Sequence, residues 1–272
     1  MNLGPMIERD GLLMRWDASD TPMARGATPL MLAARFGRRD VVRHLCKKRG
    51  ADKDEAMEDG TTALMIASYF GHQDVVRYLC NAGASKDQTR QHGATALMDA
   101  THMGHRGVVQ LLCDAGADKD QSLQDGTTAL MIASQLRDLD VVELLCACGA
   151  NKDQTRQDGA TALMMASHIG TRGVVQLLCD AGADKDQTLQ DGATALMMAS
   201  QRGHREVVEL LCESGADKDL KRQDGATAMM LASLNRHQEL ALVLYEAGAH
   251  APVRAVLEYL SNLGVDDLLR MD

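Results

Sequence analysis

The chain has 272 residues, a formal net charge of −9, 45% hydrophobic residues and only 3% aromatic residues. The acidic balance argues against a general nucleic-acid-binding protein. No apolar run reaches the length of about 18 residues that a transmembrane helix needs. The first 20 residues also lack the apolar core of a secretory signal.

Residues 1–25 carry no internal repeat. Their apolar side chains Leu12, Leu13, Met14 and Trp16 suit a cover for the end of a stacked core. Stacks of repeated units need terminal units with a polar outer face. We therefore predict an N-terminal cap over residues 1–25.

From Gly26 onward, one peptide recurs with a period of 33 residues. Gly-Ala-Thr-Ala-Leu-Met or a close variant opens near residues 26, 60, 93, 126, 159, 192 and 225, with one extra residue in the first interval. A fixed period of this length is the signature of a solenoid built from stacked units. We predict seven repeats over residues 26–250.

One copy shows what each unit contains. Thr194 is a suitable N-cap for a helix over Ala195–Arg202, which Gly203 ends through a left-handed turn. A second helix follows over about Glu206–Glu213, with Val and Leu at helical spacing. A polar loop that closes with Asp-Gly then leads into the next unit.

This unit resembles the ankyrin repeat. The resemblance is carried by Gly-x-Thr-Pro/Ala-Leu, Ala-x-x-x-Gly-His, Val-Val-x-Leu-Leu and Gly-Ala-Asp, over about Gly26 to Ala249. It implies an all-α ankyrin-repeat solenoid, in which helix-turn-helix units are joined by extended β-turn loops. One departure is systematic, because Met replaces the family's His after Thr-Pro-Leu in every copy. We expect a row of core methionines and a softer stack, since Met cannot make that histidine's hydrogen bonds.

The resemblance also implies where a partner protein binds, namely in a concave groove at the exposed ends of the first helices. The two residues before each helix-ending Gly vary while their surroundings repeat, as expected for a surface adapted to a partner. The predicted partner-binding residues are Phe36, Tyr69, Phe70, His102, Met103, Gln135, Leu136, His168, Ile169 and Arg202. A row of apolar side chains there would mark an interaction site; the alternative is that they lean back and are half-buried.

Charge is unevenly distributed along the chain. Residues 25–50 carry eight basic residues and one acidic residue, which gives 8 − 1 = +7 and leaves −16 for the remainder. Such a basic end would steer the chain toward an acidic partner, a phosphate or an anionic membrane surface. The alternative is a solvated basic face. The predicted electrostatic docking residues are Arg35, Arg38, Arg39, Arg43, Lys47, Lys48 and Arg49.

Six of the seven cysteines recur near the end of the second helix: Cys46, Cys80, Cys113, Cys146, Cys179 and Cys212. Equivalent atoms of stacked helices lie about 10 Å apart, too far for a disulfide. We predict small buried hydrophobes and a reducing intracellular compartment, either the cytoplasm or an organelle such as a plastid. Cys148 breaks the register, and the resulting Cys-Ala-Cys is weak evidence for a metal site.

No motif for catalysis appears: there is no phosphate loop, nucleophile elbow or His-Glu-x-x-His. Repetition also disperses identical residues in space, whereas catalysis needs different groups to converge. We expect no enzyme activity, no cofactor and no metal.

Residues 251–272 do not follow the repeat pattern. Val253, Val256, Leu257 and Leu260 fall at helical spacing, which predicts a helical C-terminal cap or a docking helix for a partner.

The function predicted for the whole chain is a monomeric, non-catalytic scaffold that binds another protein through its concave groove. The alternative is a structural subunit docked permanently in a larger complex, with its basic end at a membrane surface.

Overall fold

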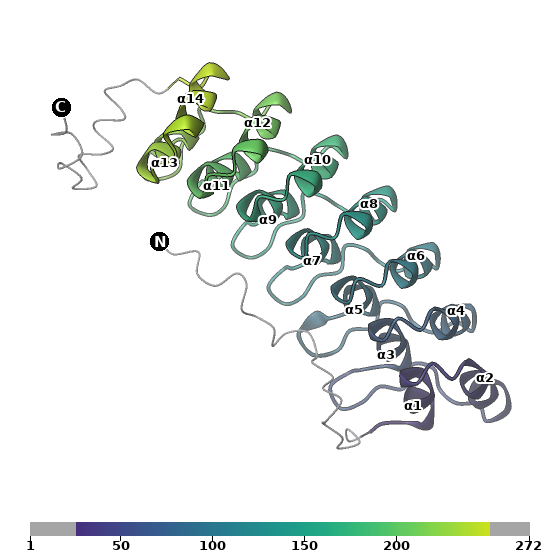
Figure 1. Ribbon diagram of the computed structural model, residues 1–272. Coiled ribbons are helices and arrows are strands. Elements are labelled where there is room, and N and C mark those ends of the chain that lie inside the picture. The colour runs from purple at the N-terminus through teal and green to yellow at the C-terminus, as the bar shows by residue number, and fades with distance from the viewer. Residues whose placement is uncertain (1–25, 251–272) are drawn as a thin grey trace. The chain divides into compact units, whose positions relative to one another are not determined.

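The structure, a computed structural model, describes residues 26–250; the predicted N-terminal cap and C-terminal segment lie outside the described residues. Figure 1 shows that the described chain consists of successive helix pairs joined by loops. The first helices of the pairs are α1 (Pro29–Arg35), α3 (Ala63–Tyr69), α5 (Ala96–His102), α7 (Ala129–Gln135), α9 (Ala162–Ile169), α11 (Ala195–Arg202) and α13 (Ala228–Leu234). The second helices are α2 (Arg39–Lys48), α4 (Gln73–Asn81), α6 (Arg106–Asp114), α8 (Leu139–Ala147), α10 (Arg172–Asp180), α12 (Arg205–Glu213) and α14 (Gln238–Glu246).

The helix boundaries follow from short-range chemistry. The threonine before each first helix accepts a hydrogen bond from the backbone N–H three residues on, as in Thr194 Oγ1 with Met197 N at 3.3 Å. The helix α11 spans the predicted residues, and α12 begins one residue before the predicted start. A short 3₁₀ turn over Gln91–Gly93, η1, lies in one loop.

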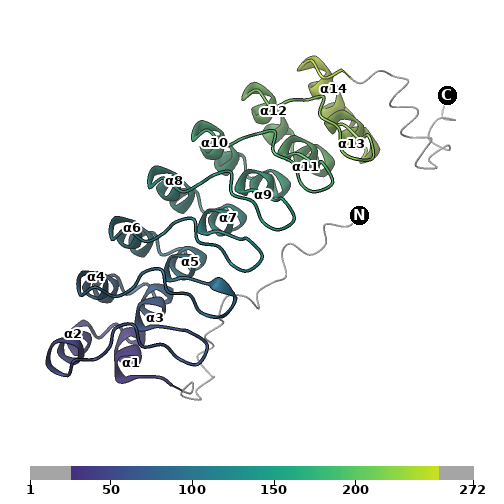
Figure 2. The same cartoon turned by 180° about the vertical axis from the view of Figure 1, so that it is seen from behind.

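The chain divides into two compact units, each described by itself. Of the described residues, unit 1 comprises 26–136 and 143–150, and unit 2 comprises 137–142 and 151–250. In unit 1 the first helices pack in the order α1, α3, α5, α7, and in unit 2 in the order α9, α11, α13. The second helices form a parallel row in each unit, as Figure 2 shows from behind.

The core is built from aliphatic and sulfur-containing side chains. The methionine at the family's His position is buried in every repeat, with 1–4% of its surface exposed: Met31, Met65, Met98, Met131, Met164, Met197 and Met230. From the second repeat to the sixth, the paired valines of the second helices are also buried, with Val75 and Val76 at 0%. Burial of such apolar surface drives the stacking of units that cannot bury it alone.

Histidines after the helix-ending glycine link neighbouring repeats. Nε2 of His72, His105 and His204 lies 2.8, 3.0 and 3.0 Å from the carbonyl oxygens of Arg35, Tyr69 and His168. Because a carbonyl only accepts, each of these Nε2 atoms carries the proton. The methionine of the Thr-Pro/Ala-Leu-Met motif cannot make the hydrogen bonds of the histidine it replaces. These three imidazoles supply hydrogen bonds between repeats instead.

The loops contain a second set of cross-repeat bonds. In Asp-Lys-Asp, the first carboxylate accepts from the N–H of the second Asp, as Asp184 does for Asp186 at 3.0 Å. The second carboxylate accepts from the backbone of the next repeat, as Asp186 does for Asp217 N at 2.8 Å. The same bond recurs 31 residues apart at Asp54, Asp87, Asp153 and Asp219. The second aspartate is thus a connector between loops rather than only a solvated charge.

Candidate protein-interaction site

A row of apolar side chains lies at the C-terminal ends of the first helices of unit 1. Each is the C-cap residue of its helix: Phe36, Phe70, Met103 and Leu136. Phe36 is 65% exposed, Leu136 45% and Met103 40%, whereas Phe70 is half-buried. We call these four residues the apolar row. Because α1, α3, α5 and α7 pack in sequence, the row follows the unit from one repeat to the next.

The aromatic end of the row is held in place by its neighbours. The Arg35 guanidinium lies 5.9 Å from the centre of the Phe36 ring and 5.8 Å from that of Phe70, so one cation joins rings from two repeats. Tyr69 meets Phe70 edge-to-face at 5.2 Å, and His72 stacks on Phe70 at 6.2 Å. Since these contacts fix the rings in advance, less conformational entropy remains to be lost when a partner binds.

The other predicted partner-binding residues divide into three groups. Tyr69, His102, Gln135 and Ile169 are half-buried, which matches the alternative reading of the sequence. Arg202 is exposed. His168 does not fit the prediction, because only 8% of its surface is exposed. The structure thus brings Phe36, Phe70, Met103 and Leu136 together in unit 1 and places His168, Ile169 and Arg202 in unit 2.

His168 is occupied by contacts within unit 2. The Arg202 guanidinium lies 3.0 Å from His168 Nε2, and because a guanidinium only donates, this nitrogen accepts. Burial, followed by the charges of Arg202 and His204, lowers the pKa of His168 below its ordinary value. His168 is therefore a neutral structural residue, and we remove it from the candidate site.

The basic residues predicted for electrostatic docking lie on α2, at its two cap positions and, for Arg35, at the end of α1. Six of them are exposed, namely Arg38, Arg39, Arg43, Lys47, Lys48 and Arg49, whereas Arg35 is half-buried against the aromatic rings. The only acidic side chain of this helix is Asp40. A cationic helix surface thus lies in the same repeat as Phe36, the most exposed member of the apolar row.

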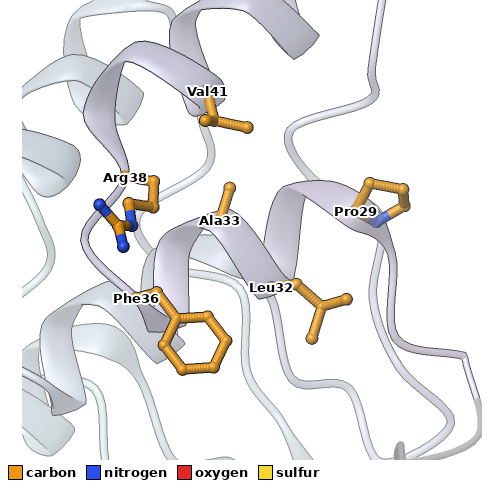
Figure 3. Close-up of a pocket in the computed structure, with 6 residues that line it drawn as sticks. All are labelled: Pro29, Leu32, Ala33, Phe36, Arg38 and Val41. Atoms are coloured by element: carbon orange, nitrogen blue, oxygen red, sulfur yellow. The ribbon is translucent and has the colours of Figure 1, made fainter.

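A shallow apolar hollow of about 490 Å³ opens on this first repeat, and sequence reasoning did not identify it. Figure 3 shows its lining, Pro29, Leu32, Ala33, Phe36, Arg38 and Val41. Leu32 and Val41 are 36% and 48% exposed, whereas their counterparts Ile66 and Val75 in the next repeat are 2% and 0% exposed. Leu32 and Val41 therefore lie on the face that later repeats bury against the preceding repeat, and within residues 26–250 no repeat packs on this face.

Comparison with known proteins agrees with this architecture. A family profile described as ankyrin repeats in three copies matches residues 30–122, 116–188 and 163–255. The chain belongs to the ankyrin-repeat family. Repeats of this family are generally protein–protein interaction domains, and their fold is generally non-catalytic. The predicted fold class is confirmed.

Solved structures of ankyrin repeat domains share the fold of this chain. The ankyrin repeat domain of Bcl-3, a member of the IkappaB family, is 31% identical, with a TM-score of 0.75 over 81% of this chain and 99% of that one. An ankyrin repeat domain from Acinetobacter baumannii is 29% identical, with a TM-score of 0.66 over 70% and 98% of the two chains. The human ASB11 ankyrin domain, 24% identical, shares the fold with a TM-score of 0.69 over 83% and 100%. No curated protein matches the sequence significantly.

Among residues 26–250, no group of three or more His, Cys, Asp or Glu side chains is placed to hold a metal ion. Within the same residues, no helix is both long and apolar enough to cross a membrane.

Proposed function

We propose that this protein is a non-catalytic scaffold whose unit 1 binds an acidic, partly apolar segment of another protein along the apolar row. The observation that carries this proposal is the row itself, three of whose four members are at least 40% exposed. Exposed apolar side chains gathered in a row mark interaction surfaces, because their burial by a partner is favourable. The exposed cations of α2 favour a partner segment that carries acidic residues.

The test uses the full chain as bait to select peptides from a random displayed library, and then measures the affinity of the selected peptides. We expect the selected peptides to combine apolar and acidic residues. The double variant Phe36→Ser/Met103→Ser should weaken their binding by about tenfold or more, since about 1.4 kcal/mol of lost contact is a factor of ten.

The matched control is Leu242→Ser/Tyr245→Ser, which removes apolar side chains that are 61% and 69% exposed on α14, outside the row. Binding to this control should equal that of the unchanged chain. Equal weakening by both double variants would show nonspecific hydrophobic adhesion and would refute the proposed site.

The role proposed for the exposed cations of α2 is tested separately. Reversing Arg38, Arg39, Lys47 and Lys48 to Glu should lower the affinity and flatten its dependence on salt, because exposed charges are screened by ions. An unchanged affinity with an unchanged salt dependence would exclude a docking role for these cations.

The exposed basic helix also supports a second candidate function, that of a structural subunit laid permanently along a larger assembly, with this helix at an anionic surface. Cross-linking of native source material separates the two. Links from Lys47 or Lys48 to one constant neighbour would favour the subunit, and absence of any heterologous link would exclude it. A scaffold that binds transiently should purify as a monomer, which light scattering measures.

The proposal includes a reducing intracellular compartment, where cysteines stay reduced. It is supported by the seven cysteines, all of which are free thiols in the structure. Fractionation of the source cells tests this compartment directly.

A further inference from the structure

The first repeat presents an apolar face to solvent in the part of the chain that the structure describes. The face includes the hollow of Figure 3, in which Leu32 is 36% and Val41 48% exposed. Pro29 and Phe36 lie three residues before and four residues after Leu32, which places them on the same side of α1. Both are exposed. We call these four residues the open face.

The second repeat shows what this face requires. The residues at three of the same positions are buried there: Ala63, Ile66 and Val75 are 1%, 2% and 0% exposed. Their cover comes from the repeat before them, since α1 packs on α3 and α2 packs on α4. Contact of comparable apolar surface with water is unfavourable, so the open face favours an apolar occupant.

The segment that leads into α1 has the composition of such an occupant. Residues 12–16 contain four apolar side chains, Leu12, Leu13, Met14 and Trp16. Trp16 precedes Pro29 by 29 − 16 = 13 residues. A stretch of 13 residues spans up to about 45 Å, at about 3.4 Å per residue. The helix α1 has seven residues and is about 10 Å long, so the segment can reach every part of the open face.

Charge favours the same occupant. Acidic residues stand on both sides of the apolar cluster, and residues 8–20 carry a net charge of 2 − 4 = −2 from Arg9, Arg15, Glu8, Asp10, Asp17 and Asp20. The open face is bordered by cations, because Arg38 lines the hollow and the exposed Arg39 and Arg43 follow on α2. Opposite charges around an apolar contact steer its formation and fix its register.

We propose that the open face is the binding site for residues 12–16 of the same chain, with the Trp16 side chain in the hollow. A segment joined to its site by a short flexible linker has an effective concentration of order millimolar. A second copy of the chain at about micromolar concentration would have to bind about a thousandfold more tightly to displace it. The tether therefore selects the chain's own segment over a second copy.

This inference does not rest on the proposed function, because the binding of residues 12–16 needs no partner protein. The two sites are neighbours, since Phe36 belongs both to the open face and to the apolar row. The bound segment would thus lie at the first-repeat end of the row.

The first experiment uses the fluorescence of Trp16, which reports on this segment alone because it is the only tryptophan of the chain. In the folded full chain we expect emission at a shorter wavelength than in urea, and weaker quenching by acrylamide. The shift should be the same at every protein concentration, because the contact is intramolecular. Emission equal to that of the unfolded chain would overturn the proposal. A shift that grows with concentration as light scattering detects dimers would also overturn it, in favour of a second copy.

Two matched double variants locate the contact. Leu32→Asp/Val41→Asp changes two side chains that are already exposed, so circular dichroism should stay unchanged while Trp16 loses its emission shift. The control Leu242→Asp/Tyr245→Asp, at positions 61% and 69% exposed on α14, should keep the shift. Retention of the shift in the first variant, or equal loss in both, would place Trp16 elsewhere and overturn the proposal.

A photo-cross-link decides the question even if Leu32→Asp/Val41→Asp fails to fold. The full chain is made with benzoylphenylalanine in place of Trp16, which leaves the open face unchanged, and is irradiated and mapped by mass spectrometry. We expect an adduct within residues 29–41 of the same chain. An adduct at other residues, or one that joins two chains, would refute the assignment.

Discussion

Arg90 and Asp99 form a bidentate ion pair within the core of unit 1. Arg90 Nη2 lies 2.6 Å from Asp99 Oδ1, and Nη1 lies 3.1 Å from Oδ2. Both side chains are buried, at 4% and 1% exposed. Arg90 comes from a loop and Asp99 from α5, where the equivalent residues Ile66 and Ile132 are apolar. In other loops Arg156 and Arg222 occupy the position of Arg90 and pair instead with Asp158 and Asp224.

The first prediction concerns the energy of this pair. Arg90→Leu should lower the free energy of unfolding by about 3–5 kcal/mol, because it leaves a buried carboxylate without its partner. The double variant Arg90→Leu/Asp99→Ile should be at least as stable as the unchanged chain, since buried ion pairs are often replaced by apolar residues without loss. It reproduces Leu123 and Ile132, which occupy the same positions one repeat later and are both 5% exposed. Urea unfolding measures both, and a double variant as unstable as the single one would contradict the argument.

The second prediction concerns pH. Burial raises the pKa of Asp99 from 3.8 to about 6, and the charge and hydrogen bonds of Arg90 only partly oppose it. The folded state therefore holds this proton more tightly than the unfolded state. The stability that Asp99 contributes is present below about pH 4 and is lost as the pH rises to about 6, a change of order 2–3 kcal/mol at about 1.4 kcal/mol per pKa unit.

The matched control for the pH effect is Asp99→Asn, which cannot titrate. The difference in unfolding free energy between the unchanged chain and this variant should shift in favour of the variant as the pH rises from 4 to 7. A difference that is flat over this range would mean that Asp99 has an ordinary pKa.

The third prediction separates two reasons why a glycine is needed. Gly170 and Gly182 both have left-handed backbones, at φ +82° and +84°. A Cβ on Gly170 would lie 2.5 Å from His204 Nδ1, whereas a Cβ on Gly182 would meet nothing within 4 Å. Gly182→Ala should cost about 1–2 kcal/mol from backbone strain alone. Gly170→Ala should cost about 1 kcal/mol more, because it displaces the His204 hydrogen bond as well. Equal costs in urea unfolding would show that the imidazole yields freely.

The fourth prediction is a stabilising change. Arg137 and Arg236 adopt φ values of +61° and +63° at the position that carries glycine in most repeats. Arg236→Gly should raise the free energy of unfolding by about 0.5–1 kcal/mol, because the left-handed strain removed is larger than the added entropy of the unfolded chain. Arg77→Gly, at an exposed position in the middle of α4, is the contrasting control and should destabilise by about 1 kcal/mol. A loss of stability in Arg236→Gly would indicate that Arg236 makes a contact that outweighs its strain.

The sequence by itself determined the repeat, its helices and its core. Thr194, Gly203 and the buried methionines act through bonds and packing within a few residues or at fixed multiples of the period, so a one-dimensional pattern is sufficient to place them. Only the tertiary structure decided which deviations from the pattern matter. It showed that Asp99 lies against Arg90 and that His168 is buried beside Arg202, because each contact depends on side-chain direction. The 33-residue period places equivalent residues in different repeats, far from one another. Only the three-dimensional structure shows which non-equivalent residues come into contact.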